Sequence, residues 1–235
     1  MNLHVGTSGY AYPEWKGTFY PPNLPAKQML RYYAEHFPAV ESNNTFRTVP
    51  TPAVLAAWMA DVPAGFKFAL KAPQRITHIK RLNGVAEPVA QFLEVAGGLK
   101  RRLGPVLFQL PPIFKEDALR LRDLLALLPR RRAALEFRHP SWFDDEVFAL
   151  LSKHGAALCI ADTDDGLDVP FVATADWGYL RLRGTDYDDA DPKVRLQRIR
   201  AQPWRDAYVF FTHEDEGNGR RLAKRLMELA GSQSR

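Results

Sequence analysis

The stretch AALEFRHPSWFDDEVFALLSKHGAALCIAD (133–162) holds two apolar runs separated by a segment with helical signals. AALEFRH (133–139) and AALCIAD (156–162) are rich in the apolar residues of buried strands. SWFDDEVFALLSKHG (141–155) begins on a serine, carries its acids early and ends in Lys-His-Gly, as a capped helix does. The order strand, helix, strand predicts two parallel strands joined by a crossover helix.

The same alternation runs along the rest of the chain. Eight apolar runs are predicted strands, at 3–8, 39–43, 66–72, 105–111, 133–139, 156–162, 178–184 and 207–213. Segments with helical spacing lie between most of them, at 26–37, 52–62, 87–103, 116–128, 141–155, 191–202 and 217–230. The segment after the sixth strand lacks a good helix. Eight such units in 235 residues predict an α/β fold, a compact TIM-type (β/α)₈ barrel with parallel strands, and a doubly wound open sheet is the alternative. No linker divides the chain, so residues 1–235 are predicted to form one domain.

Composition and charge narrow the function classes. The net charge is +5, which favours anionic partners such as a phosphorylated metabolite or nucleic acid, although many bases lie in predicted helices. A single cysteine, Cys159, permits no disulfide within the chain and fits a reducing cytoplasm. The start MNLHVGTSGY is not a signal peptide, and no apolar run approaches the ~20 residues that span a bilayer. We expect a cytoplasmic protein without a membrane partner, and leave its oligomeric state open.

Polar side chains occupy alternate positions near the ends of the predicted strands. In the fifth strand, Leu135 and Phe137 share one face, and Glu136 and Arg138 share the other. The apolar pair should face the helices, which leaves the polar pair in the barrel lumen. The same reasoning brings further polar residues to the mouth, namely Glu41, Asn43, Lys71, Gln109, Asp162, Arg181 and Arg183. Barrel enzymes build their sites at this end, so we expect a site there; the alternative is a self-neutralising ion network.

The residue types suggest chemistry on an anion. Lys71 and the three arginines could clamp a phosphate or carboxylate. The catalytic candidates are Glu41, Glu136, Lys71 and His139. His78, His139 and His213 follow strands three, five and eight, but no HxH, HxxxH or HExxH spacing supports a metal. We therefore predict no metal and no cofactor, and expect hydrogen-bonding or substrate-contacting histidines.

The loop after the first strand is aromatic. Tyr10, Tyr12, Trp15, Phe19 and Tyr20 follow GTSG (6–9). Tyr10 and Trp15 could stack a sugar or base at the mouth. Alternatively, the loop is a plug that packs against other aromatic side chains, Trp142 and Trp177. No GxGxxG, P-loop or GxSxG motif is present.

Six motifs in order resemble the YecE-like family, also known as domain of unknown function 72. They are GTSGYAYPEWKGTFYP (6–21), ESNNTF (41–46), KAPQRITH (71–78), QLPP (109–112), EFRHPSW (136–142) and WGYLRLRG (177–184). The resemblance covers nearly the whole chain and implies a TIM-type barrel, but it supplies no activity. The family pattern falls on Glu41, Asn43, Lys71, His78, Gln109, Glu136, Arg138 and His139. Two positions depart from it: the family has histidine where Arg183 stands, and Asn-Asn where Thr212-His213 stands.

Three functions remain open from the sequence. The first is a barrel enzyme acting on an anionic small molecule by hydrolysis, isomerisation or lyase chemistry. The second is a nucleic-acid-processing, nuclease-like barrel, which would need basic residues ringing the mouth. The third is a binding module without turnover, in which the mouth charges pair with one another.

Overall fold

The computed structural model describes residues 1–129, 133–162, 166–183, 191–212 and 218–232. All eight strands are parallel neighbours in chain order, and β8 pairs with β1 to close the barrel. The strands are β1 (Asn2–Ser8), β2 (Ala39–Ser42), β3 (Lys67–Lys71), β4 (Leu103–Gln109), β5 (Ala133–Glu136), β6 (Ala157–Asp162), β7 (Trp177–Leu182) and β8 (Asp206–Thr212). The predicted closed (β/α)₈ barrel is confirmed, and the open sheet is excluded.

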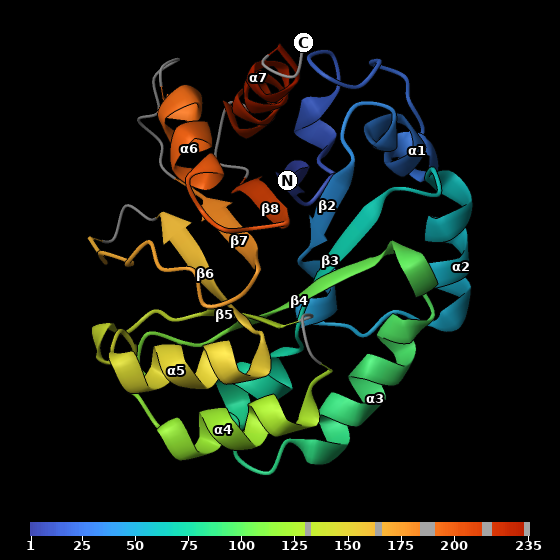
Figure 1. Ribbon diagram of the computed structural model, residues 1–235. Helices are drawn as coiled ribbons and strands as arrows, with labels where there is room; N and C mark the ends of the chain where they lie inside the picture. Colours follow the sequence, from blue (N-terminus) through green and yellow to red (C-terminus); the bar gives the residue numbers. More distant parts are fainter. Residues whose placement is uncertain (130–132, 163–165, 184–190, 213–217, 233–235) are drawn as a thin grey trace.

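Helices surround the barrel on most sides (Figure 1). They are α1 (Met29–Ala34), α2 (Pro52–Asp61), α3 (Ala86–Gly97), α4 (Ala118–Leu127), α5 (Asp145–His154), α6 (Asp191–Arg200) and α7 (Asn218–Ser232). The α5 helix starts where the Asp144 side chain accepts the N–H of Val147. It ends at Gly155, whose φ of 65° suits a residue without a Cβ. No helix of the described residues is both long and apolar enough to cross a membrane.

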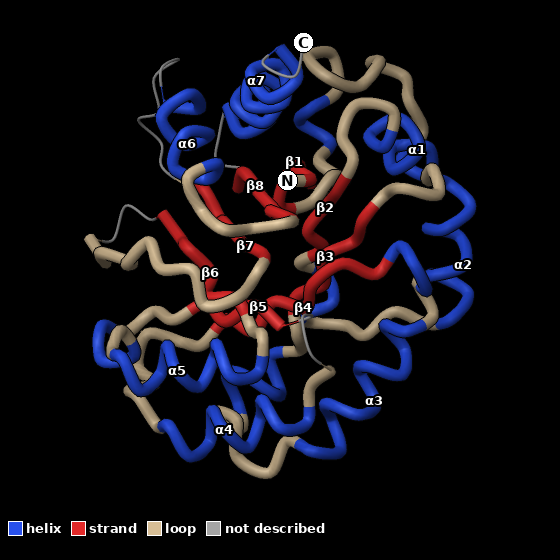
Figure 2. Tube along the Cα trace, in the orientation of Figure 1, coloured by secondary structure: helices blue, strands red, loops and turns tan. Residues whose placement is uncertain are grey.

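One side of the barrel lacks a covering helix. Between α5 and α6, only loop segments lie over β6 in the described part of the chain (Figure 2). This agrees with the sequence, which has no helical pattern after the sixth strand. A cavity of about 250 Å³ lies there, bordered by β6, β7 and α6.

Strand periodicity divides the interior into two apolar layers. Side chains such as Leu135 and Phe137 pack outward with the helices. Small residues with a few rings fill the lumen, and they include Ala39, Ala69, Leu107, Ala134, Cys159, Tyr179 and Phe210. The strand registers then set Ser8 beside Glu41, and Gln109 beside Glu136, at the carboxyl ends. The barrel is therefore filled with apolar side chains below a polar layer.

Candidate functional site

Arg181 is the centre of the polar layer. Its Nε and Nη2 atoms donate to Glu41 Oε1 at 3.1 and 2.8 Å, and its Nη1 donates to Glu136 Oε2 at 2.7 Å. Its Nη2 also lies 3.2 Å from Ser8 Oγ. All three charged side chains are buried, with 2% or less of each exposed. The guanidinium joins β2 to β5 across the lumen, and each of its nitrogens binds an acceptor.

Glu41 has a complete set of hydrogen-bond donors. The Ser8 hydroxyl and Arg181 donate to one of its oxygens, and the Tyr179 hydroxyl donates to the other at 2.6 Å. Burial disfavours the charged form of Glu41, but Arg181 and these hydroxyls outweigh it and hold the carboxyl pKa below its usual value. Burial keeps the Tyr179 pKa well above its ordinary value, so that hydroxyl remains a donor.

Glu136 carries more positive neighbours than Glu41. Gln109 Nε2 and Arg138 Nη1 donate to Glu136 Oε1 at 2.9 and 3.1 Å, and Arg183 Nη2 lies 3.7 Å from the same oxygen. Burial would raise its pKa, but Arg181 and Arg183 outweigh burial and lower the Glu136 pKa to about 2. Both carboxylates are therefore ionised at neutral pH and act as anchors for arginines.

Lys71 stands above this network at the end of β3. Its Nζ lies 4.4 Å from the centre of the Phe46 ring, and the His78 ring meets the same phenyl edge-on at 4.8 Å. An open hollow of about 700 Å³ is lined by Lys71, Phe46 and Asn43 with Asn44, Arg47 and Thr48. Burial and then the charge of Arg181 lower the Lys71 pKa to about 8. Burial, followed by Lys71, lowers the pKa of His78, which is therefore largely neutral near pH 7.

Buried polar atoms remain unpaired around this mouth. Among the described residues, Arg183 Nε, Asn43 Oδ1 and Thr212 Oγ1 have no hydrogen-bond partner. A buried polar atom without a partner is costly, and these three atoms lie at the carboxyl ends of β2, β7 and β8. Four cationic side chains lie around the two carboxylates in the described part of this layer, namely Lys71, Arg138, Arg181 and Arg183.

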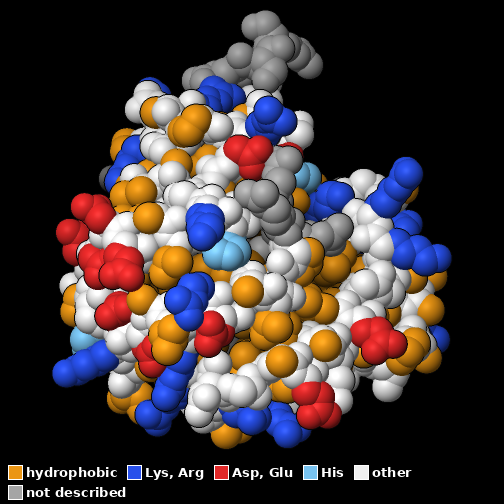
Figure 3. All heavy atoms as spheres, turned by 60° about the horizontal axis from the view of Figure 1, so that its bottom comes forward, with side chains coloured by type: hydrophobic (Ala, Val, Ile, Leu, Met, Phe, Trp, Pro, Cys, Tyr) orange, Lys and Arg blue, Asp and Glu red, His pale blue; other side chains and the backbone are white. Residues whose placement is uncertain are grey.

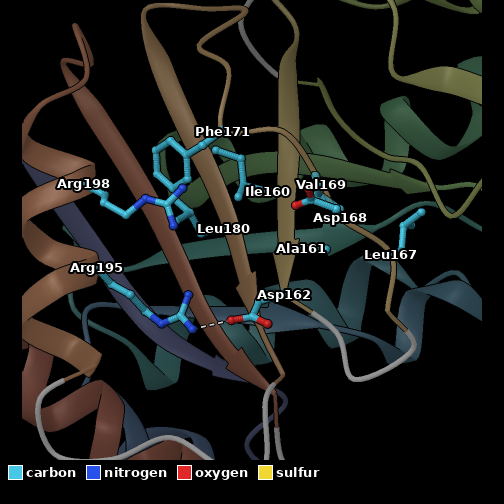
Figure 4. A pocket seen from close by; sticks show the side chains of 10 residues that line it. All are labelled: Ile160, Ala161, Asp162, Leu167, Asp168, Val169, Phe171, Leu180, Arg195 and Arg198. Atoms are coloured by element: carbon cyan, nitrogen blue, oxygen red, sulfur yellow. Dashed lines mark hydrogen bonds and ion pairs between the residues drawn. The ribbon is translucent and has the colours of Figure 1, made fainter. Parts of the chain in front are cut away.

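Asp162 does not belong to this cluster, and its prediction as a lumen residue is wrong. Cys159 and Ala161 face the lumen, so Asp162 points outward with Ile160. There it pairs with Arg195 of α6, beside the external cavity (Figure 4). The direction of the β6 side chains is hard to predict from the sequence. Small apolar residues occupy the inner face of this strand, whereas both apolar and polar residues occupy its outer face.

The aromatic loop also lies outside the site. Tyr10 packs against Tyr33 at 6.1 Å between ring centres, and Trp15 is only 2% exposed, with the Arg220 guanidinium 4.7 Å from its ring. Trp15 belongs to the outer apolar core, so the stacking interpretation does not hold for it; Tyr10 is partly buried and packs against that core. The alternative prediction, a plug that packs against Trp142 and Trp177, is correct only in that the loop is packed. Trp142 stacks on Phe137 instead.

The predicted histidines have different positions. His78 lies beside Lys71, as described above. His139 Nδ1 contacts the Ser141 hydroxyl at 2.8 Å and accepts the Ser141 N–H, so it caps the turn after β5. His213 lies outside the described residues. No group of three or more His, Cys, Asp or Glu side chains that could hold a metal occurs in the described ranges.

Sequence reasoning missed three contributors to the polar layer. Ser8 and Tyr179 both donate to Glu41, and the unpaired Thr212 hydroxyl ends β8 beside Ser8 in the strand register. The parity that selected Arg181 also selects Tyr179, two residues earlier. That signal was present, but an aromatic residue on a strand is ordinary core.

A family model described as "Protein of unknown function DUF72" matches residues 4–235. The chain belongs to the DUF72 family. A relative in Bacillus subtilis (strain 168), UPF0759 protein YunF, is 30% identical over 97% of this chain and 94% of that protein. UPF0759 protein YecE of Escherichia coli (strain K12) is also 30% identical, over 60% of this chain. That match spans only half the length of YecE.

Solved DUF72 structures share the barrel. A DUF72 family protein from Thermotoga maritima MSB8 is 26% identical, with a TM-score of 0.87 over 98% of this chain and 100% of that chain. Another, from Enterococcus faecalis V583, has a TM-score of 0.84 at 17% identity, covering 97% and 95% of the two chains, and shows the fold alone. The family and its fold are established by these matches, and its description names no activity.

Proposed function

We propose that the protein is an enzyme that binds a phosphorylated or carboxylated small molecule at the carboxyl end of its barrel. One observation carries the proposal: the half-buried Arg183 lies beside the buried pair of Arg181 and Glu136, and its buried Nε has no hydrogen-bond partner among the described residues. Burial followed by the neighbouring Arg181 lowers the Arg183 pKa, so an anion there would relieve repulsion between guanidinium groups.

The groups take different roles in this proposal. Arg183 and Lys71 hold the anion, and Arg138 lies on the same side of Glu136. Glu41 and Glu136 fix the arginines, because a carboxyl with a lowered pKa is a poor proton carrier near neutral pH. Lys71 is better suited to proton transfer, since its pKa of about 8 lies close to the working pH.

The two other functions from the sequence receive less support. A binding module with fully paired charges describes Glu41, Arg181 and Glu136, but not Lys71, whose Nζ makes no ion pair with any described residue. A nucleic-acid enzyme would need a basic ring at the mouth, whereas the run Lys100–Arg102 precedes β4 at the opposite end of the strands. On the face in Figure 3, basic and acidic side chains are interspersed. The buried Cys159, which is free, accords with a reducing compartment such as the cytoplasm.

Thermal melting with inorganic phosphate or sulfate tests the proposal, using chloride at equal ionic strength as the reference. A bound anion at ten times its Kd stabilises the fold by about 1.4 kcal/mol, which is a measurable rise in Tm. Arg183→Gln should lose most of this rise. Arg205→Gln is the matched control, because Arg205 is exposed and precedes β8 at the other end of the barrel. Equal anion responses in the parent and Arg183→Gln would reject the site.

A further inference from the structure

Lys71 has no partner that would keep its amine occupied. Its Nζ makes no hydrogen bond and no ion pair with any described residue; its contact is with the Phe46 ring. The nearby carboxylates are committed, since Arg181 binds both and Tyr179, Gln109 and Arg138 take further positions on them. A half-buried lysine at the end of a barrel strand therefore faces the 700 Å³ hollow unpaired.

We propose that Lys71 forms an imine with the carbonyl group of an anionic aldehyde or ketone held in this hollow. This deepens the proposed function and rests on it, because Arg183, whose charge acts on Lys71, would hold the anion while Arg47 lines the hollow beside Nζ. An amine becomes a nucleophile when desolvation and a neighbouring cation favour its neutral form. Both conditions hold for Lys71, whose largest influences are burial and Arg181.

The reaction is balanced with groups present at the site. The neutral Nζ adds to the carbonyl carbon, and the carbonyl π pair moves to oxygen, which takes a proton. Nitrogen releases one proton to give the neutral carbinolamine. The carbinolamine oxygen then takes a second proton and leaves as water, while nitrogen gives up its last proton and the C=N bond forms. His78 is suited to move these protons, because it flanks the same phenyl ring as Lys71 and its lowered pKa leaves a neutral imidazole. No oxidant or cofactor is required.

Borohydride trapping tests the inference directly. The protein is incubated with pyruvate or with dihydroxyacetone phosphate, reduced with sodium borohydride, and mapped by peptide mass spectrometry. An imine gives a stable secondary amine whose mass gain is that of the carbonyl compound less one oxygen atom. We expect the adduct on the peptide that contains Lys71, and the two probes distinguish a carboxylate from a phosphate ligand.

Two lysine variants and one independent measurement make the result decisive. Lys71→Arg should abolish the adduct, with circular dichroism reporting its fold. Lys67→Arg on the same strand should leave the adduct unchanged, since Lys67 Nζ already donates to the Arg101 carbonyl. Two results would overturn the proposed imine at Lys71 but not the anion site. One is a label spread evenly over the surface lysines, and the other is an unlabelled parent protein whose Tm nevertheless rises with phosphate. No label and no phosphate response together would overturn both.

Discussion

Replacing Arg181 with methionine would leave two buried carboxylates without their shared cation. Glu41 and Glu136 are both completely buried, and Arg181 donates to them at 2.7 to 3.1 Å. Removing one member of a buried ion pair costs ~3–5 kcal/mol. We expect Arg181→Met to lose about 3–5 kcal/mol in the free energy of unfolding.

The pH dependence of that loss identifies its cause. Without Arg181, Glu41 keeps only the Ser8 and Tyr179 hydroxyls among the described residues, so burial should raise its pKa above the unfolded value; the penalty is then present at neutral pH and shrinks as the carboxyl takes up a proton. Urea unfolding should show parent and variant closer in stability at about pH 5 than at about pH 7. Glu41→Gln and Glu136→Gln added to Arg181→Met should recover part of the loss.

A surface ion pair supplies the matched control. Arg31 is 65% exposed and bonds Asp61 at 2.9 Å, so Arg31→Met should cost no more than ~1 kcal/mol and show little change between these pH values. A loss below ~1 kcal/mol for Arg181→Met, or a loss independent of pH, would contradict the account of the buried network.

Four further predictions follow from the same geometry. The parent should lose stability between about pH 4.5 and pH 2 in acid titrations of its unfolding, because the Glu136 pKa is depressed in the folded state and its contribution disappears as pH falls through that value. Tyr179→Phe removes the 2.6 Å hydrogen bond to Glu41 and should cost ~1–3 kcal/mol in urea unfolding. Gly6→Ala should unfold the barrel or lower its Tm sharply, since a Cβ would lie 1.9 Å from the Ala39 carbonyl oxygen; a neutral result would mean that β1 and β2 are less tightly apposed. Stabilisation by sulfate, whose charge is constant in this range, should weaken from about pH 7 to about pH 9, as Lys71 loses its proton around its pKa of about 8; an unchanged Tm rise would exclude Lys71 from the anion site.

The barrel could be predicted from the sequence because most of its units carry their own local signals, and the sixth, which has no helical pattern, still carries its strand. The helix over Asp145–His154 was predicted from its early acids and the glycine after it, and the strands on either side are continuous apolar runs; its cap is Asp144 and not the predicted Ser141. The polar lumen of β5 and β7 could be predicted too, because leucine and phenylalanine mark the opposite face unambiguously. On β6, neither face is marked in this way, and Asp162 was placed on the wrong one.

The contacts within the site required three-dimensional information. Glu41 and Arg181 are 140 residues apart in sequence, and their bond depends on the barrel closing at a particular register. Parity predicted that Arg181 points inward, but not that all of its nitrogens would be committed to buried acceptors. The position of Trp15 depends on where the first loop folds back, and no pattern in the loop distinguishes a stacking platform from a packed core.

Anomalous diffraction from crystals soaked in selenate tests the central claim most directly. Selenate is a tetrahedral anion that resembles phosphate and sulfate, and selenium locates it without relying on the shape of the density. The account predicts a peak at the carboxyl end of the barrel, within hydrogen-bond distance of the Arg183 guanidinium and facing Lys71. The account would be contradicted if selenium peaks occurred only beside surface arginines. In that result the barrel mouth of the unmutated protein would be empty at a selenate concentration that raises the protein's Tm.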